Sequence, residues 1–219
     1  MTVVETSTPD AATTTVTTED LARPTGLAGL LGTVDHIGLG RMWVLASLLF
    51  LLVAGAAGGL VGAERIDVSE VNFLDDAVPE LFSLHATAAI FLFLVPAFIG
   101  VAMAVVPLQL GAATVAFPRA AGAAFWGWFL SGGVLVASYV IEGGPQGSDP
   151  DGILLFTVGL GGVLVSLCLG ALCVVTTVWA LRTAGMTLDR VPGLAWGMFV
   201  SGIVWLLTFP VLLAGVILL

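Results

Sequence analysis

The sequence predicts an all-α integral membrane protein, a bundle of about five transmembrane helices. Of its 219 residues, 58% are hydrophobic and only 10% are charged, and the mean hydropathy is +1.12. Soluble domains carry roughly 25% charged residues. The apolar residues are gathered in blocks of about 20, which is the length that lets a helix cross a hydrocarbon core about 30 Å thick.

The elements follow from composition along the chain. Residues 1–23 are rich in Thr, Ala, Asp and Glu, which predicts a disordered tail, because they hold too little apolar surface to fold alone. Residues 24–41 are mixed and glycine-rich, typical of an interfacial lead-in. Residues 42–219 form the predicted transmembrane domain. Its five apolar runs predict spans over residues 42–62, 81–106, 122–141, 153–181 and 194–219.

Small residues and tryptophans have predictable places in such a bundle. Small residues recur at 54–59 in the first span and at Gly159, Gly161 and Gly162 in the fourth. They favour close contact between helices in lipid. Five tryptophans fall near one boundary of the spans and predict an aromatic belt there: Trp43, Trp126, Trp128, Trp179 and Trp196.

The arginines predict the orientation. Five lie on the side of the N-terminal tail and of the loops after the second and fourth spans: Arg23, Arg41, Arg119, Arg182 and Arg190. The opposite side has Arg65 alone, among several acidic residues. The positive-inside rule therefore places the N-terminus in the cytoplasm. The formal net charge of -9 argues against nucleic-acid partners, and the apolar spans indicate the lipid bilayer as the surrounding.

His85, near the start of the second span, is the candidate site residue. It is the only histidine in the apolar runs, and an ionisable group in a membrane helix indicates function because burial without a partner is costly. The alternative is that His85 only hydrogen-bonds a neighbouring backbone group or hydroxyl. No second axial ligand is evident at its depth, where Tyr139 is the polar aromatic residue. Cys168 and Cys173, five residues apart in one span, predict neither a disulfide nor a metal pair.

Several short motifs lie within and between the spans, and their order along the chain is a specific pattern. They are Asp35-His36, Gly40, His85, Gly100, Pro107-Leu108, Gly111, Ala116-Phe117-Pro118-Arg119, Gly170, Thr176-Thr177, Arg182, Gly185-Met186-Thr187, Arg190, Pro192, Trp196 and Phe209-Pro210-Val211-Leu212. Over about residues 33–219 this pattern resembles the N-terminal five-helix portion of subunit I of the heme-copper terminal oxidases (cytochrome c oxidase).

The resemblance implies a cofactor and a ligand. His85 matches the axial histidine that the family's second helix gives to the low-spin heme, so His85 is expected to bind heme iron. The family's subunit I has about twelve helices, and its other heme and copper ligands lie in later ones. Only His36 remains as a second histidine here, so copper is not expected in this chain, and no catalytic residue is assigned.

Other departures concern the proton path and the heme surroundings. Thr114 stands where the family has an aspartate, and Met103 and Cys173 stand where it has asparagines. The family's arginine near the heme aligns with Gly62, and Arg65 lies three residues further on. The resemblance therefore implies a retained fold with altered proton-path residues.

Two functions follow as hypotheses. The first is a cytochrome c oxidase subunit I-like protein of aerobic respiration and electron transport in the plasma membrane of a prokaryote. It would bind heme through His85, and other oxidase or respiratory-chain subunits would complete the centre that reduces dioxygen. The alternative is a non-catalytic structural or assembly subunit that kept the oxidase helices. A truncated copy is a third possibility, and whether the chain acts as an enzyme is left open.

Overall fold

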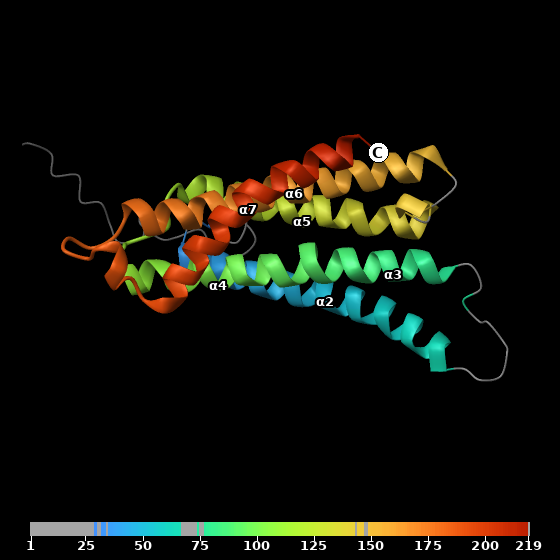
Figure 1. The fold of residues 1–219 in the computed structure, drawn as a ribbon, viewed down its shortest axis with the longest axis horizontal. Helices are drawn as coiled ribbons and strands as arrows, with labels where there is room; N and C mark the ends of the chain where they lie inside the picture. The colour runs from blue at the N-terminus through green and yellow to red at the C-terminus, as the bar shows by residue number, and fades with distance from the viewer. Residues whose placement is uncertain are drawn as a thin grey trace, which may run out of the picture. The chain divides into compact units, whose positions relative to one another are not determined.

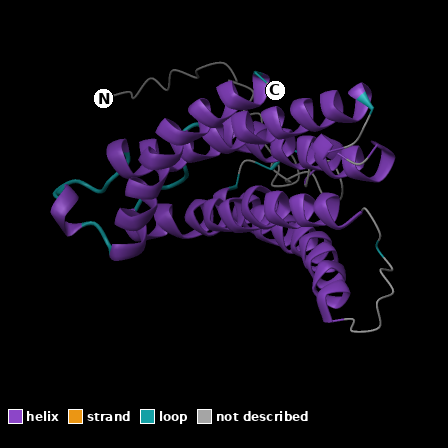
Figure 2. Cartoon of the chain, turned by 45° about the vertical axis from the view of Figure 1, so that its right-hand side comes forward, coloured by secondary structure: helices purple, strands orange, loops and turns teal. Residues whose placement is uncertain are grey.

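In the computed structural model, the described part of the chain holds five helices long and apolar enough to cross a membrane. Figures 1 and 2 show how they are arranged. The structure describes residues 29, 32–33, 35–66, 74, 77–142, 144–146 and 149–218, and the predicted tail at residues 1–23 lies outside them. Residues 33–219 pack as one unit, which is the unit described below. Among the described residues Figure 2 shows helices and no strand.

The helices follow one another along the chain. They are α2 (His36–Ile66), α3 (Val78–Thr87), η2 (Ala88–Leu94), α4 (Val95–Leu110), α5 (Pro118–Glu142), α6 (Pro150–Ala180) and α7 (Gly193–Ile217), with 3-10 turns at η3 (Gly144–Gln146) and η4 (Leu188–Arg190). Because α3, η2 and α4 continue without a break, they form one span. The five predicted transmembrane helices are thus confirmed, since five helices are long and apolar enough to cross a membrane.

Each helix begins before the apolar run that predicted it, and in α2 and α6 a polar cap accompanies the earlier start. In α2 the Asp35 carboxylate accepts a hydrogen bond from the Gly38 backbone N–H at 2.9 Å. In α6 the Asp149 carboxylate accepts one from the Asp151 N–H at 2.8 Å. Such caps satisfy backbone donors at a helix start. His36, predicted to lie in the lead-in, is therefore the first residue of α2.

The helices approach one another closely at glycines. A methyl group on Gly40 of α2 would lie 2.6 Å from the Gly100 carbonyl oxygen of α4. One on Gly159 of α6 would lie 2.8 Å from the Leu135 Cα of α5. In lipid such contacts stabilise helix pairs through van der Waals packing. The most extensive interface joins α2 to the second span (α3, η2 and α4 together), followed by the α5–α6 and α6–α7 pairs.

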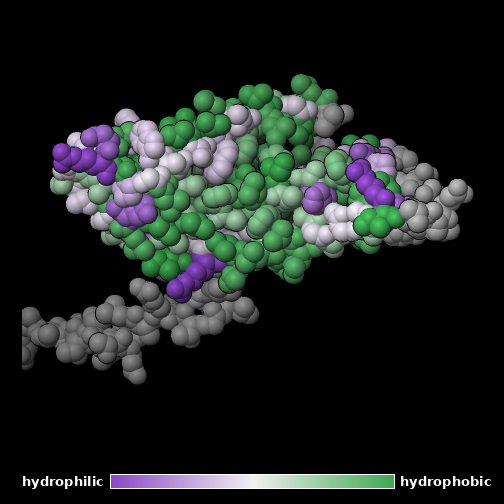
Figure 3. Space-filling model, turned by 60° about the horizontal axis from the view of Figure 1, so that its bottom comes forward, coloured by the Kyte–Doolittle hydropathy of each residue, from purple (hydrophilic) through white to green (hydrophobic). Residues whose placement is uncertain are grey.

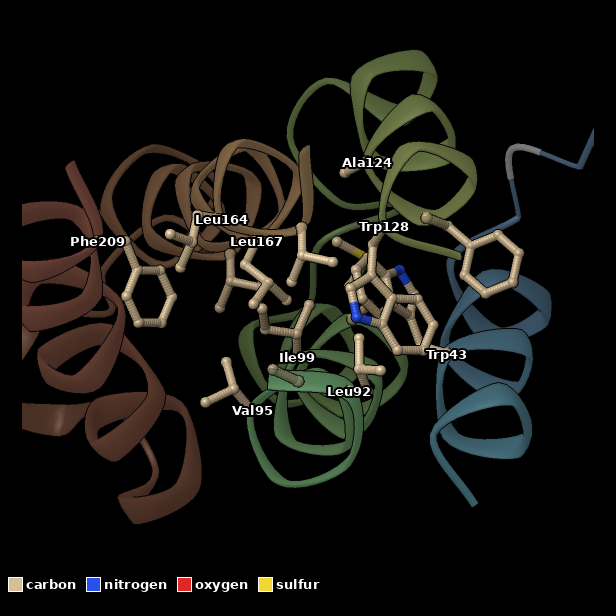
Figure 4. Packing of buried hydrophobic residues seen from close by; sticks show 14 of the residues in the cluster. Trp43, Leu92, Val95, Ile99, Ala124, Trp128, Leu164, Leu167 and Phe209 are labelled. Atoms are coloured by element: carbon tan, nitrogen blue, oxygen red, sulfur yellow. The ribbon is translucent and has the colours of Figure 1, made fainter. Parts of the chain in front are cut away.

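An aromatic cluster fills the core between α2 and α5. Trp43 and Trp128 are both 0% exposed and stack with ring centroids 4.7 Å apart (Figure 4). Phe50 packs edge-on against Trp128 at 5.4 Å. The belt prediction is therefore wrong for these two tryptophans, because both side chains are buried inside the bundle. Trp43 lies on the side of α2 that faces the other helices. Trp179 and Trp196 are 63% and 44% exposed, as a belt requires.

The outside of the unit is suited to lipid. Figure 3 shows one face on which hydrophobic residues cover the middle, while most hydrophilic residues lie toward its two ends. Many large apolar side chains on every span are exposed, among them Leu52, Phe98 and Val211. So much exposed apolar surface is expected of a membrane protein and not of a soluble monomer.

Candidate functional site at His85

His85 lies deeper in its span than the sequence indicated. The apolar run starting at Leu81 predicted a depth of roughly 6 Å at 1.5 Å per residue. The helix instead begins at Val78, with Pro79 in its first turn, where a missing backbone N–H is tolerated. His85 is therefore about 10 Å from the helix start, and its side chain is half-buried.

The imidazole of His85 is held by the backbone of α2. Its Nδ1 lies 2.8 Å from the carbonyl oxygen of Ala54. A carbonyl oxygen only accepts, so Nδ1 carries the proton and donates it, and Nε2 of the neutral ring keeps its lone pair. The ring lies directly against Gly58, where a methyl group would be 2.5 Å from Nδ1.

A depression of about 410 Å³ lies beside this imidazole, and we call it the His85 depression. Its lining comes from the C-terminal half of α2 and from α3: Gly55, Gly58, Gly59, Val61, Gly62, Arg65, Phe82 and His85. Nothing lies within 4 Å of a methyl group placed on Gly55, Gly59 or Gly62. These three glycines thus leave the space open, while Gly58 makes room for the His85 ring. The volume falls in the range of about 300–1,000 Å³ typical of small-molecule sites.

His85 is the one imidazole or thiol in this lining, and Arg65 is its one fully charged side chain. Tyr139 is the polar aromatic residue that the sequence predicted at the same depth. Its hydroxyl is hydrogen-bonded to the Ser83 hydroxyl at 2.9 Å and not to His85. Within the described part of the chain, no three His, Cys, Asp or Glu residues are grouped to hold a metal ion. The depression therefore offers one strong iron ligand.

The remaining candidates lie elsewhere. His36 is 8% exposed at the opposite end of α2, with its Nδ1 3.9 Å from an Asp35 carboxylate oxygen. About 27 Å of helix separate it from Ala54, at 1.5 Å per residue. Cys168 is half-buried and Cys173 is buried, both are free thiols, and neither lines the His85 depression. The structure thus brings none of them to His85.

Sequence reasoning missed the glycine wall of the depression. The run at residues 54–59 predicted helix contacts, and only part of it makes them: Ala54 and Ala57 are buried, whereas Gly55 and Gly59 are exposed. The available signal was the spacing of Gly55, Gly58, Gly59 and Gly62. Residues three and four apart share one face of a helix.

Comparison with known proteins identifies the family. Residues 38–219 match the family described as cytochrome C and quinol oxidase polypeptide I. The chain is 30% identical to cytochrome c oxidase subunit 1 of Corynebacterium efficiens over 200 residues, which cover 85% of this chain and 34% of that protein. It is 30% identical to quinol oxidase subunit 1 of Bacillus subtilis over 201 residues, covering 85% and 31%.

A third relative is a putative cytochrome c oxidase subunit 1-beta of Streptomyces coelicolor, 30% identical over 201 residues and covered to 35% of its length. The chain thus spans about a third of the length of these relatives. The match covers all five spans, in agreement with the motifs that flank them. The chain belongs to the cytochrome c and quinol oxidase polypeptide I family.

Proposed function

We propose that this membrane protein is an oxidase subunit I-like component of aerobic respiratory electron transport that binds one heme through His85. The carrying observation is the hydrogen bond from His85 Nδ1 to the Ala54 carbonyl at 2.8 Å. It leaves Nε2 as the ring nitrogen with a free lone pair beside an open depression. Bacterial relatives named as oxidase subunits support the plasma membrane of a prokaryote as its location.

The residues present fit a heme. Imidazole is a common axial ligand, and metal-binding histidines nearly always donate their second nitrogen to a carbonyl or carboxylate, which orients the ring. The glycines leave room for a flat macrocycle against α2. Arg65 would offset negative charge on the cofactor. When bound, the heme would supply a one-electron redox centre.

Reduction of dioxygen would need further ligands from other polypeptides. The chain holds two histidines, and His36 lies at the far end of α2 from His85. Because His85 is the one imidazole that lines the depression, we propose that other oxidase or respiratory-chain subunits supply the remaining ligands. The relatives are named for cytochrome c or quinol, so either is a candidate donor.

A second candidate is a non-catalytic scaffold or assembly subunit. The specific observation in its favour is the same Ala54 bond, because it satisfies one polar atom of His85 without any cofactor. The residues at the family's proton-path positions also favour it. Thr114 stands where the family has an aspartate, and a hydroxyl does not carry protons as a carboxylate would. Met103 and Cys173, which stand where the family has asparagines, are both fully buried.

An absorption spectrum of the detergent-purified protein from heme-replete cells distinguishes the two. The heme proposal expects a Soret band that His85→Ala removes and His36→Ala keeps. Because His36 is the chain's other histidine, it is the matched control. A pigment-free protein that still associates with oxidase subunits would support the scaffold function and reject heme binding.

A further inference from the structure

We propose that Trp128 is a positioning residue for His85, acting through a π-helical turn in the second span. This turn, η2 (Ala88–Leu94), starts three residues after His85. At its end the Val95 backbone N–H donates to the Ile90 carbonyl, five residues back instead of four. Such turns hold one extra residue within a helix and are frequent at functional sites.

Pro96 accounts for the wide turn. In an α-helix its ring would press on the carbonyl four residues back, that of Leu92, and it has no N–H to donate. The π-turn relieves the contact but leaves the Phe91 carbonyl without a partner in its own helix. The donor four residues on, Val95, is bonded to Ile90, and the residue five positions on is the proline.

Trp128 of α5 supplies the missing donor. Its indole Nε1–H donates to the Phe91 carbonyl oxygen at 3.1 Å. Trp128 is completely buried and stacks on Trp43 of α2 (Figure 4). Phe50, also of α2, packs against it with the two rings at 75°. The indole therefore links the π-turn of the second span to the buried aromatic cluster between α2 and α5.

The turn decides which face of the span presents the imidazole. In a continuous α-helix, at about 100° per residue, Ala104 would be turned about 100° away from His85. One residue absorbed in the π-turn removes about that rotation. In the structure both do face α2, Ala104 against Gly40 and His85 against Ala54 and Gly58. Trp128 thereby holds the rotation that lets His85 reach the Ala54 carbonyl.

The test measures the tautomer of the His85 imidazole directly. With ¹⁵N-labelled histidine the heme-free protein in detergent gives signals from His36 and His85 alone, and His36→Ala assigns them. In the wild type, His85 should be a single tautomer protonated at Nδ1. Trp128→Phe, which keeps the ring stack but removes the donor, should shift His85 toward a mixture of both tautomers. The double variant Pro96→Ala/Trp128→Phe should shift it at least as far.

Matched controls separate positioning from general loosening. Trp126→Phe removes a half-buried tryptophan two residues away, and Pro210→Ala removes a proline inside α7. Both should leave the His85 signals unchanged. Should Trp128→Phe fail to fold, the double variant still serves, because the Pro96→Ala change restores a backbone N–H for the free carbonyls. His85 signals in the double variant identical to wild type would overturn the inference.

The inference deepens the proposed heme function and rests on it in one respect, because it concerns the same imidazole. The signals are nevertheless measured without heme. A protein that shows no Soret band but the expected tautomer change would refute the proposed function alone. A Soret band together with unchanged His85 signals would refute this inference alone.

Discussion

At the scale of the residue, the two ring nitrogens of His85 have different surroundings. Nδ1 is 2.8 Å from the Ala54 carbonyl, as expected for a buried polar atom. The ring also lines the His85 depression, where no other imidazole is available. A backbone bond that fixes the tautomer is compatible with iron binding at Nε2 and prepares the ring for it. The bond to Ala54 is therefore compatible both with a purely structural His85 and with the proposed heme ligand.

Gly58 should be as sensitive as His85 itself. In Gly58→Ala the added methyl group would lie 2.5 Å from Nδ1 and 2.8 Å from Cε1 of His85, so the ring must move and lose the Ala54 carbonyl. Loss of a group that orients a metal ligand lowers metal affinity about 10- to 100-fold. We expect a decrease of that size in heme affinity, measured by Soret titration of the apoprotein.

Gly133→Ala is the control for Gly58→Ala. Gly133 is also a helical glycine, on α5, and an added methyl group would meet nothing within 4 Å. Its heme affinity should match the wild type. An unchanged affinity in Gly58→Ala would contradict the geometry of the site.

The sequence alone could indicate His85 but not its surroundings. A single histidine in an apolar run is visible by inspection. The rotation of the span is not, because it depends on the π-turn and on a tryptophan from another helix. For the same reason the sequence could not distinguish glycines that pack against another helix from glycines that face open space. Gly159 packs against the α5 backbone, whereas Gly59 faces open space.

At the scale of the element, hydropathy predicted the number of spans, while the helices extend beyond the predicted apolar runs. The interiors are determined by the need to satisfy every backbone group within lipid, which favours helices of bilayer length. The ends depend on single capping residues such as Asp35 and Asp149, to which an averaged hydropathy is insensitive. The fold was thus predictable wherever many residues contribute to one property.

Motif residues and their neighbours form hydrogen bonds that join elements or complete the end of a helix. The loop after α4 is tied to α6 because the Thr177 hydroxyl accepts from the Ala116 backbone N–H at 2.8 Å. Thr183 donates its hydroxyl proton to the Leu110 carbonyl at 2.5 Å, which joins the end of α4 to the loop after α6. Arg182 donates to the Val178 carbonyl at 2.6 Å at the end of α6. These residues explain a scaffold retained without proton-path residues.

Thr177→Val should therefore loosen the bundle. Valine has nearly the same shape, but it leaves the buried Ala116 N–H without an acceptor, at a cost of about 1–3 kcal/mol. The measurement is denaturant unfolding in detergent followed by circular dichroism. In the control, Thr208→Val, the lost bond goes only to Val204 of its own helix at an exposed position, so the change should stay within about 0.5 kcal/mol. Equal losses of unfolding free energy in the two variants would mean that the bond from Ala116 to Thr177 stabilises the protein no more than a bond within one helix.

At the scale of the whole molecule, the chain combines a scaffold that matches the family with one imidazole in the His85 depression, which is the proposed iron ligand. Its match to the oxidase family includes all five spans. The close α2–α4 contact at Gly40 and Gly100, both motif residues, shows why those positions resemble the family's. Motifs of this kind could be recognised from sequence because each is local. A heme and copper centre needs ligands gathered from many helices, and the relatives extend well beyond this match.

Metal analysis of the purified chain tests the proposal that this chain binds one heme iron and that other subunits complete the heme and copper centre. With His85 as the one imidazole in the depression and no metal-binding group among the described residues, we expect at most about one iron per chain and no bound copper. His85→Ala should reduce iron to background, while His36→Ala should not. The chain alone should also take up no oxygen with reduced cytochrome c or a quinol, because one axial ligand leaves no second metal beside the heme. Stoichiometric copper, or oxygen uptake by the chain alone, would contradict the proposal that other subunits complete the centre.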